Sequence, residues 1–172
     1  MKILETKRLI LRVLSAADAD MILRLLNQAD FLTNIGDKGV RNFQDACEYI
    51  EQGPVAMQQA LGFSLYCCQL KTTGEAIGMS GLIKRDGVEH PEVGFSFLSE
   101  YQRQGYGKES VSAVINYARD ELLLKKLNAI CNPDNKGSIA LLTSQKFEEI
   151  GLVSVPNIDE DVLLFERFLG QE

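Results

Sequence analysis

A short glycine-bearing segment, residues 102–107 (QRQGYG), joins a strand-like stretch to a helix-like one. Residues 92–98 read as a strand. Residues 105–124 have helical apolar spacing, with one face formed by Val111, Val114, Ile115 and Ala118. A chain with this order must leave a sheet, turn sharply and begin a helix at the edge of that sheet. This strand–turn–helix unit is the element around which the remaining segments have to be arranged.

The other segments supply the rest of a sheet. Strands are predicted at residues 8–13, 63–70, 76–84, 126–131, 148–153 and 162–168. Helices are predicted after Ser15, over about 43–60 with a break near Gly53 and Pro54, and over about 136–145. The resulting fold class is α+β, or mixed α/β, around one central sheet. No linker or repeat divides the 172 residues, so we expect a single domain, 1–172.

The turn after residues 92–98 is suited to binding an anion. Backbone N–H groups and the positive end of a helix dipole meet there, and such a place binds phosphate without special side chains. Gly105 and Gly107 permit a close approach of the backbone, and Arg103 and Lys108 add positive charge. We expect a pyrophosphate at this turn.

Two common phosphate motifs do not fit this segment. A P-loop requires G-x-x-x-x-G-K-[ST], but Lys108 is followed by Glu109, and Gln102 stands where the first glycine would be. A dinucleotide fingerprint requires G-x-G-x-x-G, and Ser110 occupies the place of its third glycine. Both readings fail, so we expect the pyrophosphate to belong to another kind of ligand.

Gln102, Gly105 and Gly107 match Q/R-x-x-G-x-G/A, the acetyl-CoA signature of the GNAT N-acetyltransferases. The neighbouring segments resemble the same family in the same order: residues 92–98, 105–110 (GYGKES) and 135–138 (NKGS). Residues 4–12 (LETKRLILR) and 76–81 (AIGMSG) resemble the subgroup that includes the ribosomal-protein N-terminal acetyltransferases. The resemblance extends over nearly the whole chain.

The resemblance implies a GNAT-like fold and a direct reaction. Its central sheet would be mixed, mostly antiparallel, flanked by helices, and splayed between its fourth and fifth strands, residues 92–98 and 126–131. The acceptor amine would attack the thioester of acetyl-CoA in a ternary complex. Because no covalent enzyme intermediate is needed, Cys47, Cys67, Cys68 and Cys131 need not be nucleophiles.

The resemblance also implies which residues bind the cofactor. The pyrophosphate would be cradled by backbone N–H groups of the segment Gln102, Arg103, Gln104, Gly105, Tyr106, Gly107 and Lys108. The backbone of Phe95 and Phe97 would pair with the pantetheine arm, and a strand N–H near Phe95 would stabilise the oxyanion. Asn135 and Ser138 would face the cofactor, although Asn135 is equally well suited to cap a helix.

The sequence identifies the proton-transfer residues less completely than the cofactor-binding residues. Glu92 begins the strand beside the acceptor pocket and is the candidate base, directly or through a water. Many family members have a tyrosine as general acid where this chain has Leu142, and Lys146 replaces the usual glycine. Ser138, Ser144 or a water therefore remain as alternatives. Tyr101 and Tyr106 are expected to pack and to line the cofactor loop.

Composition limits the partners. The formal net charge of −6 argues against nucleic-acid binding and suits an amine. Four cysteines without a C-x-x-C pair and a single histidine predict no metal site and reduced, packed thiols. No apolar run reaches the roughly 20 residues of a membrane span, and no signal peptide is recognisable. A cytoplasmic monomer or homodimer is the expectation.

Three acceptor hypotheses remain open at this point. The first is a protein N-terminal amine. The second is a small amine such as a polyamine, an amino acid or an antibiotic. The third is that the chain binds acyl-CoA as a sensor without catalysis, which the absence of a tyrosine at Leu142 keeps open.

Overall fold

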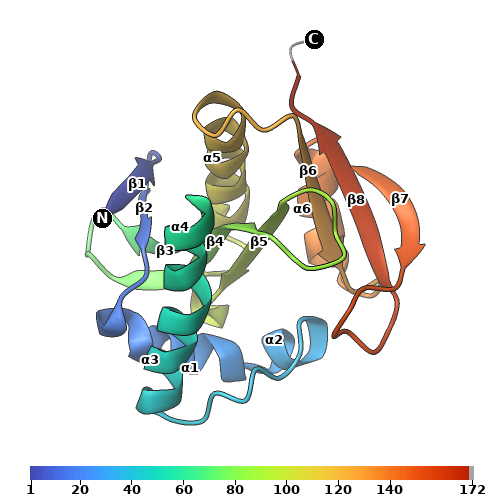
Figure 1. Cartoon of the computed structure of the whole chain (residues 1–172). Coiled ribbons are helices and arrows are strands. Elements are labelled where there is room, and N and C mark those ends of the chain that lie inside the picture. The colour runs from blue at the N-terminus through green and yellow to red at the C-terminus, as the bar shows by residue number, and fades with distance from the viewer. Residues whose placement is uncertain (171–172) are drawn as a thin grey trace.

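The computed structural model describes residues 1–170 and contains one eight-stranded sheet (Figure 1). The strands lie in the order β1-β2-β3-β4-β5-β6-β8-β7, and every neighbouring pair is antiparallel except β5 and β6. Their bounds are β1 Lys2–Glu5, β2 Leu9–Val13, β3 Leu65–Leu70, β4 Ala76–Ile83, β5 Glu92–Phe97, β6 Lys126–Cys131, β7 Glu148–Val153 and β8 Val162–Phe168.

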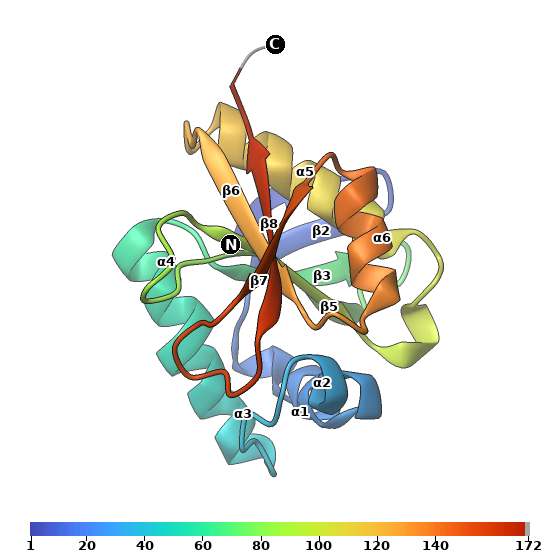
Figure 2. The ribbon, with the colours of Figure 1, turned by 90° about the vertical axis from the view of Figure 1, so that its right-hand side faces the viewer.

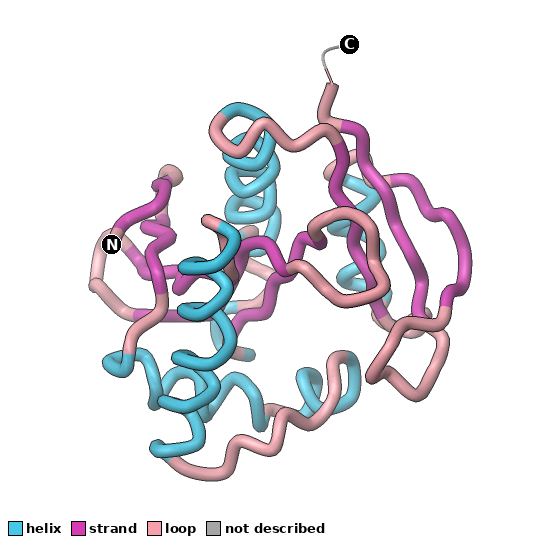
Figure 3. Tube along the Cα trace, in the orientation of Figure 1, coloured by secondary structure: helices cyan, strands magenta, loops and turns pink. Residues whose placement is uncertain are grey.

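Helices cover both faces of the sheet (Figures 2 and 3). α5 and α6 lie on one side, and α1 to α4 lie on the other. None of the helices in residues 1–170 is long and apolar enough to cross a membrane. Their bounds are α1 Ala19–Asn27, α2 Ala29–Asn34, α3 Phe43–Ile50, α4 Ala56–Leu61, α5 Tyr106–Asp120 and α6 Lys136–Ser144, with 3-10 turns at Ala16–Asp18 and Ser99–Tyr101.

The predicted fold class is confirmed, with three differences in detail. The sequence reasoning missed β1 and α2, which are short. It also predicted a break near Gly53 and Pro54: the α-helix is interrupted there, but by a π-helical turn, Glu51–Val55, that joins α3 to α4. Proline lacks an N–H and clashes with the carbonyl four residues earlier in a regular helix. The wider π turn accommodates the ring, so the helical path continues.

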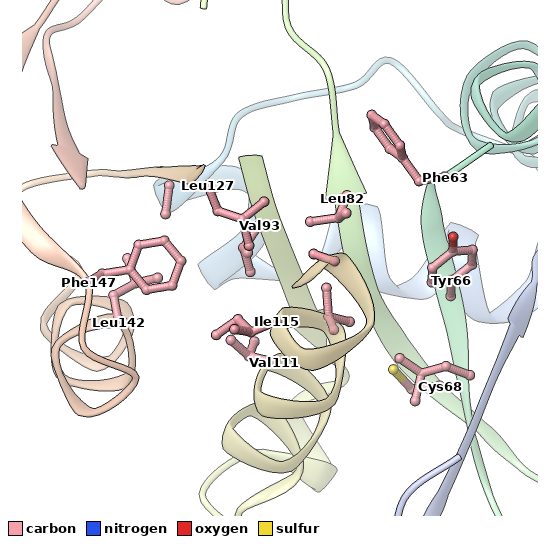
Figure 4. Packing of buried hydrophobic residues seen from close by; sticks show 14 of the residues in the cluster. Phe63, Tyr66, Cys68, Leu82, Val93, Val111, Ile115, Leu127, Leu142 and Phe147 are labelled. Carbon is pink, nitrogen blue, oxygen red and sulfur yellow. The ribbon is translucent and has the colours of Figure 1, made fainter. Parts of the chain in front are cut away.

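Two apolar clusters sandwich the sheet. The first lies under α5 and α6, and Figure 4 shows Val93 and Leu127 from β5 and β6 close to Val111 and Ile115 of α5. The second lies under α1 and α3. Cys68 belongs to the first cluster and Cys67 to the second, so these adjacent residues face opposite sides of the sheet. Burial raises the pKa of the Cys67 thiol to about 12, so it stays protonated at neutral pH.

α6 ends in a Schellman motif. This motif explains why the family that the sequence resembles usually has a glycine where this chain has Lys146. Phe147 N donates to Leu142 O and Lys146 N donates to Thr143 O, both at 3.0 Å. This arrangement places Lys146 in the left-handed region at φ 62°. A side chain there costs about 1–2 kcal/mol relative to the right-handed conformation.

We therefore predict that Lys146→Gly is more stable than Lys146→Ala by about 1 kcal/mol, because only glycine relieves the left-handed strain. Urea denaturation of both variants and the wild type measures the difference. Lys146→Ala is the control, since it removes the charge and keeps the Cβ atom. Equal stabilities of the two variants would contradict this explanation.

Candidate active site

β5 and β6 meet at one point and then diverge. Their register contains the single pair Glu92↔Asn128, next to which Asn128 N donates to Pro91 O at 2.9 Å. Within residues 1–170 the two strands form no later pair. Because they run in the same direction, the gap between them opens toward their carboxyl ends. The splay between these two strands, the fourth and fifth by the sequence prediction, is confirmed.

The backbone edge of β5 faces this gap at alternate residues. Leu98 N donates to Ile77 O on the β4 side, whereas Pro91 O accepts from β6 on the other side. Successive residues of a strand alternate in this way, so the amide groups of Phe95 and Phe97 point toward the gap. Phe97 O already accepts bonds from two glutamine side chains, and Phe95 lies deeper in the opening.

The glycine turn lies at the open end of the gap. Gly105 at φ 86° caps α5, and Arg103 is also left-handed at φ 59°. Glu109 N donates to Gly105 O at 3.0 Å, which starts the helical bonding. The N–H groups of the preceding helical residues have no partner inside the helix. They provide a cluster of backbone donors at the positive end of the helix dipole.

Gly107 packs closely against α6. A Cβ atom at Gly107 would lie 2.9 Å from Cδ1 of Leu141 in α6. The missing side chain therefore allows α5 and α6 to approach each other beside the gap. The sequence reasoning assigned this glycine to a close approach of the ligand, and the structure adds this second reason for it.

The polar side chains of the turn hold the loop or face solvent. Gln102 Nε2 donates to Phe97 O at 2.9 Å and to Asp30 Oδ2 at 2.7 Å. Gln104 Nε2 donates to Glu100 O at 2.8 Å. Arg103 and Lys108 are exposed, and neither forms an ion pair with any described residue. Their charges are therefore available to an anion.

The N-terminal segment is fastened to this turn, which the sequence reasoning did not anticipate. Glu109 accepts bonds from Thr6 Oγ1 at 2.6 Å, Arg8 N at 2.8 Å and Arg8 Nε at 2.7 Å. Arg8 Nη1 continues to Gln104 O at 2.9 Å, and its guanidinium lies over the Tyr106 ring at 4.2 Å. These contacts of Thr6 and Arg8 with Glu109, Gln104 and Tyr106, called the clamp below, hold the N-terminal segment against the start of α5.

The clamp predicts how the stability of the folded protein depends on pH. Partial burial alone would raise the pKa of Glu109, but the bonds from Thr6 and Arg8 outweigh it and the pKa is lowered. A lowered folded-state pKa stabilises the protein above the unfolded value of about 4.3, and this contribution is lost as pH falls through the folded value.

We expect Glu109→Gln to destabilise the chain at pH 7, and the deficit to shrink as pH falls below about 4.3. Urea denaturation at several pH values measures this. Glu121→Gln at the far end of α5 serves as the control and should show no comparable deficit. A deficit for Glu109→Gln that is independent of pH would contradict the clamp.

The start of α6 also lies at the carboxyl end of β6. Asn135 Oδ1 accepts from Ser138 N at 3.2 Å, so the asparagine caps the helix. Leu142 is buried in the core beside Phe147 and itself offers no proton donor (Figure 4). The Ser144 hydroxyl donates within its own helix to Leu141 O at 2.7 Å. Tyr101 donates to Glu75 Oε2 at 2.6 Å.

Glu92 lies at the closed end of the gap, on the face opposite the core under α5. It is 1% exposed, and its Oε2 atom accepts from Arg85 Nε at 3.0 Å. Arg85 was missed by the sequence reasoning, because it precedes β5 by a loop whose path no local pattern reveals. α5 and α6 thus start at the open end of the gap, and the buried carboxylate of Glu92 occupies its closed end.

Comparison with known proteins decides the family. Residues 8–148 match the acetyltransferase (GNAT) domain. The chain belongs to this family. Among curated GNAT relatives is YoaA of Bacillus subtilis (strain 168), described as an uncharacterized N-acetyltransferase, 27% identical over 152 residues that cover 88% of this chain and 85% of YoaA. The chain is an acetyl-CoA-dependent acetyltransferase.

Solved structures share the fold. The ribosomal L7/L12 alpha-N-protein acetyltransferase RimL in complex with coenzyme A superposes with a TM-score of 0.82 and 17% identity, covering 98% of both chains. The microcin C7 self-immunity acetyltransferase MccE, in complex with acetyl-CoA and AMP, gives a TM-score of 0.77 and 18% identity, covering 94% of this chain and 93% of MccE. At these identities the likeness concerns the fold.

Proposed function

We propose that this GNAT enzyme transfers the acetyl group of acetyl-CoA to a primary amine by direct attack, with a protein N-terminal amine as the acceptor. The observation that carries the proposal is the wedge-shaped gap between β5 and β6, called the wedge below. The start of α5 lies at its open end and buried Glu92 lies at its closed end. A cofactor anchored at the open end points its thioester toward that carboxylate.

Acetyl-CoA is held mainly by backbone groups. The N–H groups that begin α5, from Tyr106 to Lys108, bind the pyrophosphate, and the exposed Arg103 and Lys108 neutralise its charge. The pantetheine arm lies against the β5 edge as an added strand. The Phe95 N–H donates to the thioester oxygen as negative charge develops there. Asn135 and Ser138 border the arm from the start of α6.

Glu92 is the general base for the acceptor amine. An α-amine with a pKa near 8 is partly neutral at physiological pH, whereas a lysine amine near 10.4 is not. The Glu92 carboxylate accepts the proton lost on attack, directly or through a water. Since Leu142 is buried and Ser144 bonds within α6, Ser138 or a water remains to protonate the leaving thiolate.

The acceptor assignment is supported by two observations. Residues 4–12 and 76–81 resemble the ribosomal-protein subgroup, and RimL, named for a ribosomal-protein N-terminus, has the same fold over 98% of the chain. A small amine is the second candidate, because MccE, named for microcin self-immunity, also shares the fold over 94% of the chain.

A thiol-release assay tests the proposal. Acetyl-CoA is mixed with alanine-, serine- and methionine-initiated peptides, spermidine, free amino acids and an aminoglycoside. Turnover on peptides with a free N-terminus, and none on a control peptide with a blocked N-terminus, supports the first candidate. Turnover only on small amines supports the second. Tight acetyl-CoA binding without turnover on any amine would instead indicate a sensor and refute the proposal.

We expect Glu92→Gln to lower kcat by about 100-fold, the usual range for loss of a general base, while the Kd for acetyl-CoA stays the same. Steady-state kinetics and calorimetric titration separate the two effects. Glu89→Gln is the matched control, since the Glu89 side chain is 86% exposed and lies on the loop that precedes β5. Unchanged kcat in Glu92→Gln would remove this residue from the mechanism.

Gly105→Ala should weaken acetyl-CoA binding by about tenfold, because a side chain at φ 86° costs roughly 1–2 kcal/mol and pushes the turn out of shape. Its Cβ would also lie 3.2 Å from Arg8 Nη2. Gly62→Ala imposes similar strain at φ 78°, at the end of α4, with no atom within 4 Å. If both variants bind acetyl-CoA equally well, the turn does not form the cofactor site.

A further inference from the structure

Asn128 in β6 carries a buried acceptor without a partner. The residue is 4% exposed, and its Oδ1 atom has no hydrogen-bond partner among the described residues. A buried polar atom in this condition lowers the stability of the folded chain, because it has lost its water and gained nothing in return. Such an atom calls for an explanation, and a ligand that supplies the missing donor is one.

The position of Asn128 is at the closed end of the wedge. It is the β6 member of the single pair that joins β6 to Glu92 of β5. Its neighbours Leu127 and Ala129 face the core under α5, so Asn128 lies on the opposite face. Glu92 lies on that same face, because Val93 belongs to the α5 core. An acceptor oxygen and a carboxylate are therefore adjacent where the amine must attack.

The neighbouring strands explain why Asn128 Oδ1 stays unpaired. On the other side of β6, Asn128 is paired in register with Glu166 of β8. Glu92 is bonded to Arg85 at 3.0 Å and Glu166 to Lys126 at 2.8 Å. Both flanking groups are carboxylates, which cannot donate when ionised. Neither Arg85 nor Lys126 forms a hydrogen bond with Asn128 Oδ1, so within the described residues the donor is left to come from outside.

We propose that Asn128 Oδ1 and Glu92 together bind the two N–H groups of a neutral primary amine. This inference rests on the proposed function and names the group that orients its acceptor. A neutral primary amine has two N–H bonds and one lone pair. Asn128 takes one N–H, the Glu92 oxygen not bonded to Arg85 takes the other, and the lone pair is left to point at the thioester.

This arrangement makes the enzyme selective for primary amines. A secondary amine, such as an N-methylated terminus or proline, has a single N–H when neutral. It leaves one of the two acceptors buried and unpaired, and sites built to bond an N–H reject analogues that lack it. Charge alone would not produce this selectivity, since both kinds of amine carry the same charge when protonated.

Asn128→Leu tests the inference, because leucine has a similar volume and removes the polar atoms. We expect kcat/KM for the amine to fall by about tenfold or more, with the Kd for acetyl-CoA unchanged. The unfolding temperature should stay the same or rise, since an unpaired buried group is removed. Asn128→Thr, which keeps an acceptor on a β-branched side chain, provides a second variant and should retain more activity.

Ser80→Ala is the matched control. Ser80 Oγ is the other buried side-chain atom without a partner in residues 1–170, and it lies on β4, away from the pair of β5 with β6. Its removal should leave both the kinetics and the acetyl-CoA affinity unchanged. The comparison separates loss of an unpaired polar atom in general from loss of the one beside Glu92.

The readout specific to Asn128 is the preference for primary amines. The fastest member of the amine panel is compared with its N-methyl counterpart, for example an alanine-initiated peptide with the N-methylalanine peptide. Wild type should favour the primary amine, and Asn128→Leu should reduce this ratio by about tenfold, because one of the two N–H contacts is gone.

The two proposals fail in different ways. If the wild type acetylates no amine, the proposed function fails and this inference fails with it. If the wild type is active but Asn128→Leu keeps both its kcat/KM and its preference for primary amines, only the inference about Asn128 is refuted. A parallel fall in unfolding temperature and activity, with the amine preference unchanged, would show a merely structural role and refute it as well.

Discussion

The hydrogen bond from Asn128 N to Pro91 O, at 2.9 Å, is the contact on which the wedge depends. On one side of it lie five strands paired antiparallel, β1 to β5, and on the other lie β6, β8 and β7. Strands in a twisted sheet normally stay paired along their length, but here the pairing ends after Glu92 and Asn128. The divergence exposes one edge of β5 and brings two helix starts together at the open end.

The strands diverge without loss of the fold because other contacts hold the two halves. α5 packs its apolar face under both β5 and β6, so Val93 and Leu127 share one core with Val111 (Figure 4). Glu109 then ties the start of α5 to the N-terminal segment through Thr6 and Arg8. The gap can therefore stay open while its rim is fixed.

The sequence predicted the parts of this arrangement that depend on local patterns. All seven predicted strands and the start of α5 lie within a residue or two of their observed bounds, because alternation and glycine position act locally. The partners of Glu92 and Glu109 could not be predicted. Arg85 and Arg8 reach them through loop paths and strand pairings that only the folded chain defines. The same is true of Asn128, which looks ordinary in a strand until its register beside Glu92 is known.

Two local features lower the stability of the folded chain, the left-handed backbone of Lys146 and the unpaired Oδ1 atom of Asn128. They show how strain and function can be distinguished. Lys146 is left-handed at φ 62°, but its N–H and that of Phe147 complete the end of α6, so the conformation brings its own compensation. Asn128 Oδ1 has no such compensation within the described chain. Natural sequences tend to violate a local rule where function requires it. An uncompensated acceptor beside the carboxylate at the apex of the wedge therefore points to the amine, whereas the strained lysine concerns only the helix it ends.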